Sequence, residues 1–386
     1  MDKPAIIGGR PRFTEVLPIT KPTLPDYESI RGNVEDIMKT GMVTNSKNVR
    51  SFEKAASSYM GVKHAVAMNS CTAGMMLVMK SLKLRGEVIT PSFTFCATTN
   101  AIEWCGMKPV FADIEEGYLC ADPNHVNELV TKKTSAILAT HVFGNPCDIG
   151  ALQDIADDRK IRLFFDAAHC FGSEYKGKKI GNFGDAESFS LSPTKLVVAV
   201  EGGFLTTNDD EIARLGIMGR DYGHDGSYDC EFAGLNARME EFNAIIGNET
   251  LKRLEKNLQM RTDLVGIYRQ GLSKVPGISF QKIRDRSRTT YKDFPLILDE
   301  KEFGLSRDQL YESLRMENII SKKYFDPPSH KQRAFRQDIR LPVTDSIAPR
   351  IISIPLFSHM PKDDVKKVIE TIKNIHENAE DIRKAL

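Results

Sequence analysis

IRLFFDAAHCFG, residues 161–172, decides the fold: an apolar run typical of a buried strand ends abruptly at an acidic residue, Asp166. The helix-like segment DIGALQDIADDRK, residues 148–160, precedes this run, and a second strand-like run, AESFSLS at residues 186–192, follows it. Parallel strands need long crossovers between them, and these are usually helices. The order therefore favours a parallel sheet with helices packed on its faces.

The same alternation extends in both directions from this stretch. Further strand-like runs begin at residue 64 and are HAVAMN, GEVITPS, KPVFADI, SAILATHVFG and GGFLTTN. The helix-like segments between them include TAGMMLVMKSLKL and FCATTNAIEW. We therefore predict an α/β fold with a mostly parallel mixed sheet flanked by helices, whose ligand lies beyond the carboxyl ends of the strands.

The C-terminal third of the chain has a different pattern. A long helical pattern at residues 237–272 ends near PGISF, where proline and glycine indicate a break. A smaller α+β arrangement is expected beyond it, formed by a strand in YKDFPLIL, a helix opened by Ser306, a strand in IISIPLF and a final helix from PKDDVKKVIETI. We expect a large domain at 1–260 and a small C-terminal domain at 261–386.

Composition excludes several classes of protein. The 386 residues are 41% hydrophobic, and 53 Lys and Arg nearly balance 52 Asp and Glu, so neither nucleic acid nor an anionic membrane is an expected partner. The sequence has no leader-like apolar segment and no run long enough to span a membrane, so a cytoplasmic protein is expected. Seven scattered cysteines without a CxxC pair favour neither a disulfide framework nor a metal site.

Asp166 is the first candidate for chemistry, because its place at the end of an apolar strand predicts a partly desolvated carboxylate. Such a group needs a cationic or hydrogen-bonded partner, and a protonated pyridine nitrogen would suit it. The alternative is that Asp166 caps the next helix or binds an arginine.

The stretch MNSCTAGMM, residues 68–76, is the second candidate, since a strand passes there through small polar residues into a helix. Free N–H groups at a helix N-terminus suit a phosphate. The alternative is an ordinary N-cap. The chain has neither a Walker lysine nor a GxGxxG motif, which disfavours a nucleotide triphosphatase or a dinucleotide site.

Lys195, in SPTK at residues 192–195, is the third candidate, with Ser190 just before it. A lysine among apolar and small residues could be kept partly neutral and bond covalently to an aldehyde, although a loop lysine exposed to water is the alternative. A phosphate seat, an acid for a ring nitrogen and an amine for an aldehyde together match the polar groups of pyridoxal 5′-phosphate (PLP). Phe95 could stack on its ring, or it could be an ordinary core residue.

The sequence resembles the DegT/StrS family of sugar aminotransferases, which are PLP enzymes of fold type I. The resemblance covers nearly the whole chain, and the motifs that carry it occur in the family's order. They are TNSKNVRSFEKAASSYMGVKHAVAMNSCTAGMML, PSFTFCATTNAI, FFDAAHCFG, SFSLSPTKLVVAVEGG, GLNARMEEFNAIIG, YFDPPSHKQRAF and LPVTDSIAPRIISIPLF.

The resemblance assigns roles to single positions. It implies that Lys195 is the catalytic lysine that binds the PLP aldehyde and later shuttles a proton, and that Asp166 pairs with the pyridine nitrogen. His169 takes the place of a Gln or His near the ring hydroxyl. A few relatives carry histidine in place of the lysine and act as dehydratases, and Lys195 argues against that activity.

The remaining cofactor contacts also follow from the resemblance. Cys71 and Thr72 match the turn that holds the phosphate, Ser190 adds a hydroxyl, and Phe95 matches the ring-stacking position. Asn236 matches a residue that reaches the phosphate across a subunit interface, which implies a homodimer with shared active sites. Two departures are the LVVAVEGG run after the lysine, which is usually more polar, and the cysteine at position 71.

The substrate is implied less directly. FFDAAHCFG and THVFG look most like the branch that acts on nucleotide-linked 4-keto-6-deoxyhexoses, usually dTDP-linked, with L-glutamate as donor and 4-amino-4,6-dideoxy sugars as products. Arg220, Tyr222 and His330 lie where relatives contact the sugar nucleotide, although an ordinary ion pair or a satisfied histidine would explain them equally well. Two other hypotheses are a different keto acceptor, such as a 3-keto sugar nucleotide or a keto-inositol, and a non-catalytic protein that binds sugar nucleotides.

Overall fold

The central sheet of the computed structural model, which describes residues 3–386, has seven strands. Their order across the sheet is β1 (His64–Met68), β9 (Gly203–Thr207), β8 (Ala186–Ser190), β5 (Arg162–Asp166), β4 (Thr134–Thr140), β2 (Glu87–Pro91) and β3 (Lys108–Ala112). Strand β9 pairs antiparallel with both β1 and β8, and the other neighbouring pairs are parallel. The predicted mostly parallel mixed sheet is thus confirmed.

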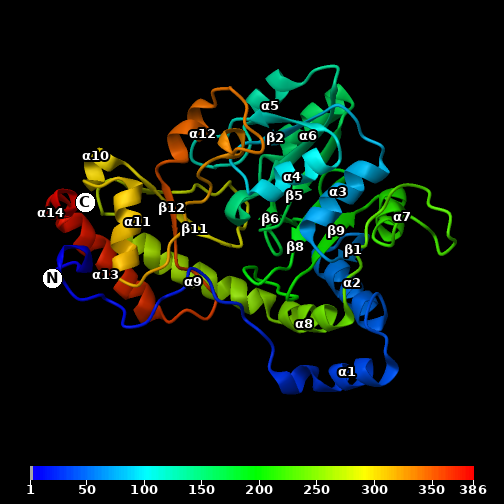
Figure 1. The fold of residues 1–386 in the computed structure, drawn as a ribbon, viewed down its shortest axis with the longest axis horizontal. Helices are drawn as coiled ribbons and strands as arrows, with labels where there is room; N and C mark the ends of the chain where they lie inside the picture. The colour runs from blue at the N-terminus through cyan, green and yellow to red at the C-terminus, as the bar shows by residue number, and fades with distance from the viewer. Residues whose placement is uncertain (1–2) are drawn as a thin grey trace.

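Helices cover both faces of this sheet because its strands alternate apolar side chains between two cores (Figure 1). In β5, Leu163 and Phe165 belong to one core and Phe164 to the other. The first core takes side chains from α2 (Lys47–Met60), α5 (Pro123–Leu129), α6 (Ile149–Arg159) and α8 (Glu241–Lys252). The second takes them from α3 (Cys71–Ser81), α4 (Cys96–Trp104) and α7 (Asp210–Gly219).

A smaller antiparallel sheet lies beside the large one, with the order β10 (Ile278–Phe280), β11 (Phe294–Leu298) and β12 (Ile351–Ile354). Ser306 caps α11 (Arg307–Met316) through a capping box with Gln309, as its sequence position predicted. The other helices around this sheet are α10 (Glu300–Phe303), α12 (Pro342–Ile347), α13 (Lys362–Glu377) and α14 (Ala379–Ala385). A short hairpin, β6 (Glu174–Tyr175) and β7 (Lys178–Lys179), lies outside both sheets.

The long helical pattern at residues 237–272 forms two helices, α8 and α9 (Leu254–Leu272), which meet at Arg253. Helix α9 joins the two cores: Leu254 and Leu258 pack in the large one, and its later apolar side chains pack in the small one. The N-terminal segment contributes Phe13 and Leu17 to the small core as well. The division of the chain at residue 260 remains a prediction.

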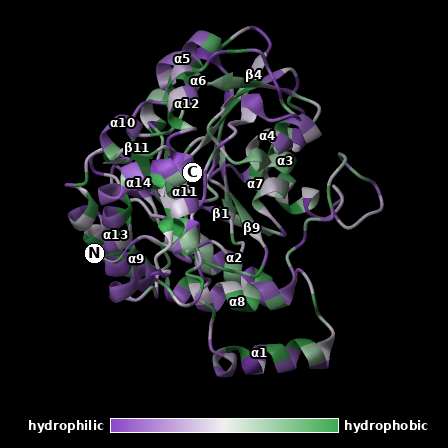
Figure 2. Ribbon diagram, turned by 60° about the vertical axis from the view of Figure 1, so that its left-hand side comes forward, coloured by the Kyte–Doolittle hydropathy of each residue, from purple (hydrophilic) through white to green (hydrophobic). Residues whose placement is uncertain are grey.

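Hydropathy follows this layering. Figure 2 shows hydrophobic residues concentrated in strands such as β1 and β9, with hydrophilic residues on the outward parts of the surrounding helices. Helix α1 (Tyr27–Thr40) lies at the edge of the molecule beside α8 (Figures 1 and 2). Its Ile37 is buried, whereas Tyr27 and Met38 are exposed. Within residues 3–386, no helix combines the length and apolar character needed to cross a membrane.

Strand register determines where polar side chains collect. Thr140, Asp166 and Ser188 are directly paired across β4, β5 and β8, so they form one row near the carboxyl ends of these strands. Backbone contact brings the start of α3 to the same edge, because a Cβ at Gly203 would lie 2.5 Å from the Cys71 nitrogen and 2.6 Å from the Phe189 oxygen.

The close backbone contacts at Gly203 predict that any side chain at this position destabilises the fold. Gly203→Ala should lower the free energy of unfolding by about 1–3 kcal/mol, because the added methyl group meets backbone atoms that cannot move aside easily. Urea unfolding followed by circular dichroism measures this change. Gly32→Ala is the matched control, since a Cβ there meets open space within α1, and it should be neutral or stabilising by about 1 kcal/mol. Equal effects of the two substitutions would contradict the packing argument.

Candidate active site

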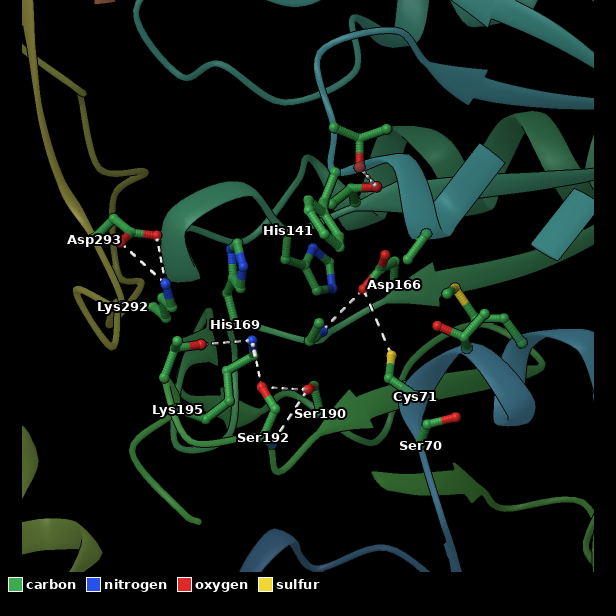
Figure 3. Close-up of a pocket in the computed structure, with 18 of the residues that line it drawn as sticks. Ser70, Cys71, His141, Asp166, His169, Ser190, Ser192, Lys195, Lys292 and Asp293 are labelled. Carbon is green, nitrogen blue, oxygen red and sulfur yellow. Dashed lines mark hydrogen bonds and ion pairs between the residues drawn. The ribbon is translucent and has the colours of Figure 1, made fainter. Parts of the chain in front are cut away.

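A cavity of about 370 Å³ opens at the carboxyl ends of β4, β5 and β8, as expected for an open α/β sheet. Residues packed around the seven-stranded sheet line most of it, and Lys292 and Asp293, just before β11, together with residues 324–325 line the rest. Figure 3 shows the polar side chains that face this space. The residues that line the cavity include Ser70, Cys71, Thr72, Phe95, His141, Asp166, His169, Ser190, Ser192, Thr194, Lys195, Glu201, Lys292, Asp293, Tyr324 and Phe325.

Asp166 is the last residue of β5, and only 4% of it is exposed. Its Oδ2 accepts the Thr98 hydroxyl at 2.6 Å, and its Oδ1 accepts the Ala168 N–H at 3.0 Å. Burial raises the pKa of this carboxyl, while these hydrogen bonds and the charges of Lys195 and His141 oppose the rise. Asp166 has no ion pair within residues 3–386, so it is a buried carboxylate without a cationic partner.

The N-terminus of α3 forms one wall of the cavity. The Ser70 hydroxyl accepts the Ala73 N–H at 3.1 Å, so Ser70 is the N-cap. The N–H groups of Cys71 and Thr72 have no backbone or side-chain acceptor within the described chain, which leaves them available to an anion. The N-cap interpretation and the anion-seat interpretation are therefore compatible here.

Lys195 lies opposite this wall and is partly buried. Its Nζ donates to the Ser192 and Thr194 hydroxyls at 3.2 and 3.1 Å, and it has no carboxylate within 4 Å among residues 3–386. Burial, followed by the charge of Lys292, lowers the pKa of this amine from 10.5 to about 8. A substantial fraction is therefore neutral near physiological pH, as a nucleophilic amine requires.

His169 and Phe95 complete the predicted set within the cavity. The His169 Nδ1 accepts the Phe143 N–H at 3.1 Å, so the ring proton is assigned to Nε2. Burial and the charges of Lys292 and Lys195 hold the pKa of His169 well below its usual value, so it is a neutral donor. Phe95 is 54% exposed although it lines the cavity, and its ring is available for stacking.

Asn236 and Tyr222 do not line the cavity of the single chain. Asn236 is exposed, and its carbonyl accepts the Asn69 side-chain amide at 3.1 Å. Tyr222 is 47% exposed and stacks with His224 at 6.5 Å between ring centroids. Both belong to the surface segment that follows α7.

Arg220 and His330 also lie outside the cavity, and both are buried. The Arg220 guanidinium pairs with Glu53 and donates to the Ala67 carbonyl at 2.8 Å. His330 lies between Ser92, whose Oγ is 2.6 Å from Nδ1, and Asp345, whose Oδ1 is 3.3 Å from Nε2. Substrate roles for these residues stay predictions.

Several cavity residues were not expected from the sequence. Lys292 and Asp293 form an ion pair on the cavity wall, His141 stacks on Phe165 at 4.7 Å, and Tyr324 comes from the small-domain side. The only signal for the ion pair is local: two adjacent opposite charges interrupt the strand-like run YKDFPLIL. His141 and Tyr324 have no such signal.

These residues fit PLP. Asp166 is a buried carboxylate that lacks a cation, the free N–H groups of Cys71 and Thr72 suit a phosphate, and Lys195 is an amine without a carboxylate partner. The exposed ring of Phe95 supplies an apolar surface beside them. Each polar part of the cofactor thus has a complementary group that is otherwise unused.

Comparison with known proteins gives a consistent result. The spore coat polysaccharide biosynthesis protein SpsC of Bacillus subtilis is 33% identical over 366 residues, covering 90% of this chain and 94% of that protein. The dTDP-4-amino-4,6-dideoxy-D-glucose transaminase of Escherichia coli is 31% identical over 369 residues, covering 93% of this chain and 98% of that protein. The crystal structure of DesI in the presence of its TDP-sugar product matches with a TM-score of 0.94 at 32% identity, covering 98% of each chain.

The model of the DegT/DnrJ/EryC1/StrS aminotransferase family matches residues 26–373, which is nearly the whole chain. This match confirms the predicted enzyme class, and the structural likeness confirms the predicted fold. Members of the family depend on PLP, which confirms the predicted cofactor. The chain belongs to the DegT/DnrJ/EryC1/StrS aminotransferase family, and it is a PLP-dependent aminotransferase.

Proposed function

We propose that the protein transfers the amino group of L-glutamate to a nucleotide-linked keto sugar, with dTDP-4-keto-6-deoxyhexose as acceptor and a 4-amino-4,6-dideoxy sugar as product. The observation that carries this proposal is the pairing, in one cavity, of an amine of lowered pKa at Lys195 with the unpaired buried carboxylate of Asp166. The named activity of the E. coli relative and the TDP-sugar product present with DesI support a sugar nucleotide as substrate.

Asp166 would hold the proton on the pyridine nitrogen. When bound, PLP supplies a conjugated ring that accepts electrons from the carbon next to the transferred nitrogen. Because Asp166 is desolvated, its carboxylate gains more from a cationic N–H partner than a hydrated carboxylate would. The Thr98 hydroxyl and the Ala168 N–H fix the direction of its two oxygens.

Lys195 would move a proton between the two carbons that flank the transferred nitrogen. Its Nζ is near the ionisation midpoint at neutral to slightly alkaline pH, which suits a group that must both accept and donate a proton. The hydroxyls of Ser192 and Thr194 orient this nitrogen when it is free. Phe325 packs against Phe143 at 5.6 Å and adds an apolar wall that limits access of water.

The proposed enzyme is a homodimer with shared active sites. The proposal is supported by the exposure of Asn236 and Tyr222 outside the cavity of their own chain, since exposed side chains are accessible to a second subunit. Tyr27 and Met38, on the α1 helix at the edge of the molecule, are 60% and 73% exposed. Exposed apolar side chains on an edge helix favour burial against a partner.

Replacing Lys195 tests the proposed function. The visible absorbance of the PLP-loaded wild-type protein should bleach with L-glutamate and return with the keto sugar nucleotide, whereas Lys195→Ala should lower turnover by at least about 10⁴-fold, because it removes both the covalent and the proton-transfer role. Lys54→Ala, at an exposed position on α2, is the control. A panel of 3-keto sugar nucleotides and keto-inositols tests the acceptor. Unchanged turnover in Lys195→Ala would refute the assignment.

The lowered pKa of Lys195 predicts a pH dependence. Only the neutral amine attacks an aldehyde, so the rate at which the cofactor-free protein binds PLP covalently should rise with pH, with a midpoint of about 8. The rate is lower below this pH because the amine is protonated, and it levels off above it. Stopped-flow absorbance over a series of pH values measures the midpoint. A midpoint near the ordinary lysine value of 10.5 would contradict the buried environment.

Shared active sites predict complementation between two inactive variants. Lys195→Ala removes the amine, and Asn236→Asp should weaken binding of the PLP phosphate by placing a negative charge beside it. Mixed dimers should then contain one site with both wild-type groups and recover part of the activity. Turnover after joint refolding of the two variants, compared with each variant refolded alone, measures this effect. No recovery in dimers shown to be mixed would contradict a shared site.

A further inference from the structure

Lys292 and Asp293 form a buried ion pair on the cavity wall. Each is 5% exposed, and the Lys292 Nζ lies 3.0 Å from both carboxylate oxygens of Asp293. The main chain at this point is held firmly: the Lys292 N–H donates to the Phe143 carbonyl at 3.1 Å, and the Arg261 Nη1 donates to the Lys292 carbonyl at 3.0 Å. The small-domain side of the molecule thus presents an oriented pair of charges to the site (Figure 3).

Stability does not account for such a pair. Removing two charges from water opposes folding, and apolar residues of similar volume often replace a buried ion pair without loss of stability. Lys292 and Asp293 are also adjacent in sequence, so their contact connects no distant parts of the chain. A buried pair that lines a reactive cavity is instead a candidate for ligand recognition.

The amino donor needs a cation in this cavity. An amino acid carries its α-carboxylate on the same carbon as the reacting amine, so the carboxylate must lie close to the position where Lys195 acts. Within residues 3–386, Lys195 and Lys292 are the only lysines or arginines that line the cavity. Lys195 is committed to the cofactor, and His169 is neutral, so Lys292 is the cation that one chain's described residues leave in the cavity for the donor carboxylate.

Lys292 is also placed suitably for this role. Its charge is felt at both Lys195 and His169, and Figure 3 shows its side chain on the same side of the cavity as these two residues. The Lys292 Nζ lies 5.7 Å from the centroid of the Tyr324 ring, which gives the ammonium a second favourable contact when it is shared between Asp293 and another carboxylate.

The same space must then accept a substrate of different charge. After the donor has left, a sugar ring without a charge at the reacting carbon occupies the position of the amino acid. A lone buried ammonium would be unpaired at that stage, at a large desolvation cost. Asp293 removes this difficulty because it lies within hydrogen-bond distance of the same ammonium.

We propose that Lys292 binds the α-carboxylate of the amino donor with one N–H of its ammonium, and that Asp293 is an internal counter-ion that stays hydrogen-bonded to the same ammonium, shares it with the donor and keeps it paired when the sugar occupies the cavity. This inference rests on the proposed function, because it assumes an amino-acid donor and a sugar acceptor that use one cavity in turn.

The test compares variants of the PLP-loaded protein. Lys292→Gln with Asp293→Asn removes both charges together and leaves no lone buried ion, Asp293→Asn removes the counter-ion alone, and Lys292→Arg keeps the cation. The matched control neutralises the exposed pair Lys63 and Asp210 as Lys63→Gln with Asp210→Asn. Three quantities are measured: the glutamate concentration that half-bleaches the cofactor absorbance, the sugar nucleotide concentration that restores it, and the calorimetric affinity for glutarate, a dicarboxylate that cannot react.

The double variant should raise the half-saturating glutamate concentration and weaken glutarate binding by about 10- to 100-fold, the range expected for one charge-assisted hydrogen bond. Its response to the sugar nucleotide should change little. Asp293→Asn should bind glutarate as tightly as wild type or more tightly and should bind the sugar less well. Lys292→Arg should keep glutarate binding within a few-fold of wild type.

Each outcome has one meaning. Wild-type affinity for glutamate and glutarate in the double variant overturns the role of Lys292, even though the proposed function stands. Equal losses for donor and sugar indicate a general defect of the site and also overturn it. If the double variant does not fold, as judged by circular dichroism, Asp293→Asn decides: weaker glutarate binding in that variant overturns the counter-ion role. Absence of bleaching by glutamate in the wild-type protein refutes the proposed function itself.

Discussion

A carboxylate that is buried without a cation is the constraint on which the site depends. Asp166 closes β5 in the middle of the sheet, where leaving the carboxylate unsolvated is costly unless hydrogen bonds replace the lost water. A chain of hydroxyls supplies such bonds, since Thr140 contacts Thr94 at 3.0 Å, Thr94 contacts Thr98 at 2.9 Å, and Thr98 donates to Asp166 at 2.6 Å. This series of hydrogen-bonded hydroxyls connects β4 and the start of α4 to the carboxylate. The position of α4 and the orientation of the Asp166 carboxylate therefore depend on each other.

Charge alternation around the cavity follows from this constraint. Among the described residues that line it, Asp166, Asp293 and the exposed Glu201 are acidic, and Lys195 and Lys292 are basic. The charge of Lys292 lowers the pKa of Lys195, whereas the charges of Asp293 and Asp166 raise it. Burial is the largest cause of the lowered value, so the shape of the cavity matters more to this amine than any single neighbour. Because Lys292 and Asp293 directly precede β11 of the three-stranded sheet, the electrostatics of Lys195 depend on how the two sheets pack together.

Much of this arrangement could be predicted from sequence because its signals are local. An apolar strand that stops at Asp166, a capping box at Ser306 and a lysine after a strand are each visible within a few residues. The division of the long helical pattern at Arg253 has no proline or glycine to announce it, and packing against two cores accounts for it better than propensity. Strand β9 runs antiparallel to its neighbours β1 and β8. A hydrophobic run predicts a strand but not its neighbours or its direction, so this feature could not be predicted from the sequence.

Long-range contacts explain the remaining differences. His330 bonds Ser92 across 238 residues of chain, and a histidine in a polar stretch gives no indication of that partner. The Lys292–Asp293 pair is visible in the sequence, but its place on the cavity wall depends on the approach of β11 to the large sheet. Site residues at the ends of the strands in the large sheet can therefore be predicted from the sequence more readily than site residues that come from segments beside the small sheet.

Cys71 shows how a departure from the family pattern can leave the geometry intact. Its thiol is buried 3.3 Å from the Ser188 carbonyl, and burial and the charge of Asp166 raise the pKa of this thiol, so it is a neutral donor rather than a nucleophile. The Ser188 hydroxyl in turn donates to the Cys71 carbonyl at 2.8 Å, and Gly74 leaves room for that hydroxyl. These contacts join the start of α3 to β8 beside Asp166. The start of α3 and the buried carboxylate are consequently tied together, and a cysteine is compatible with the proposed phosphate site at this position because its thiol bonds the Ser188 carbonyl while its backbone N–H stays without an acceptor in the described chain.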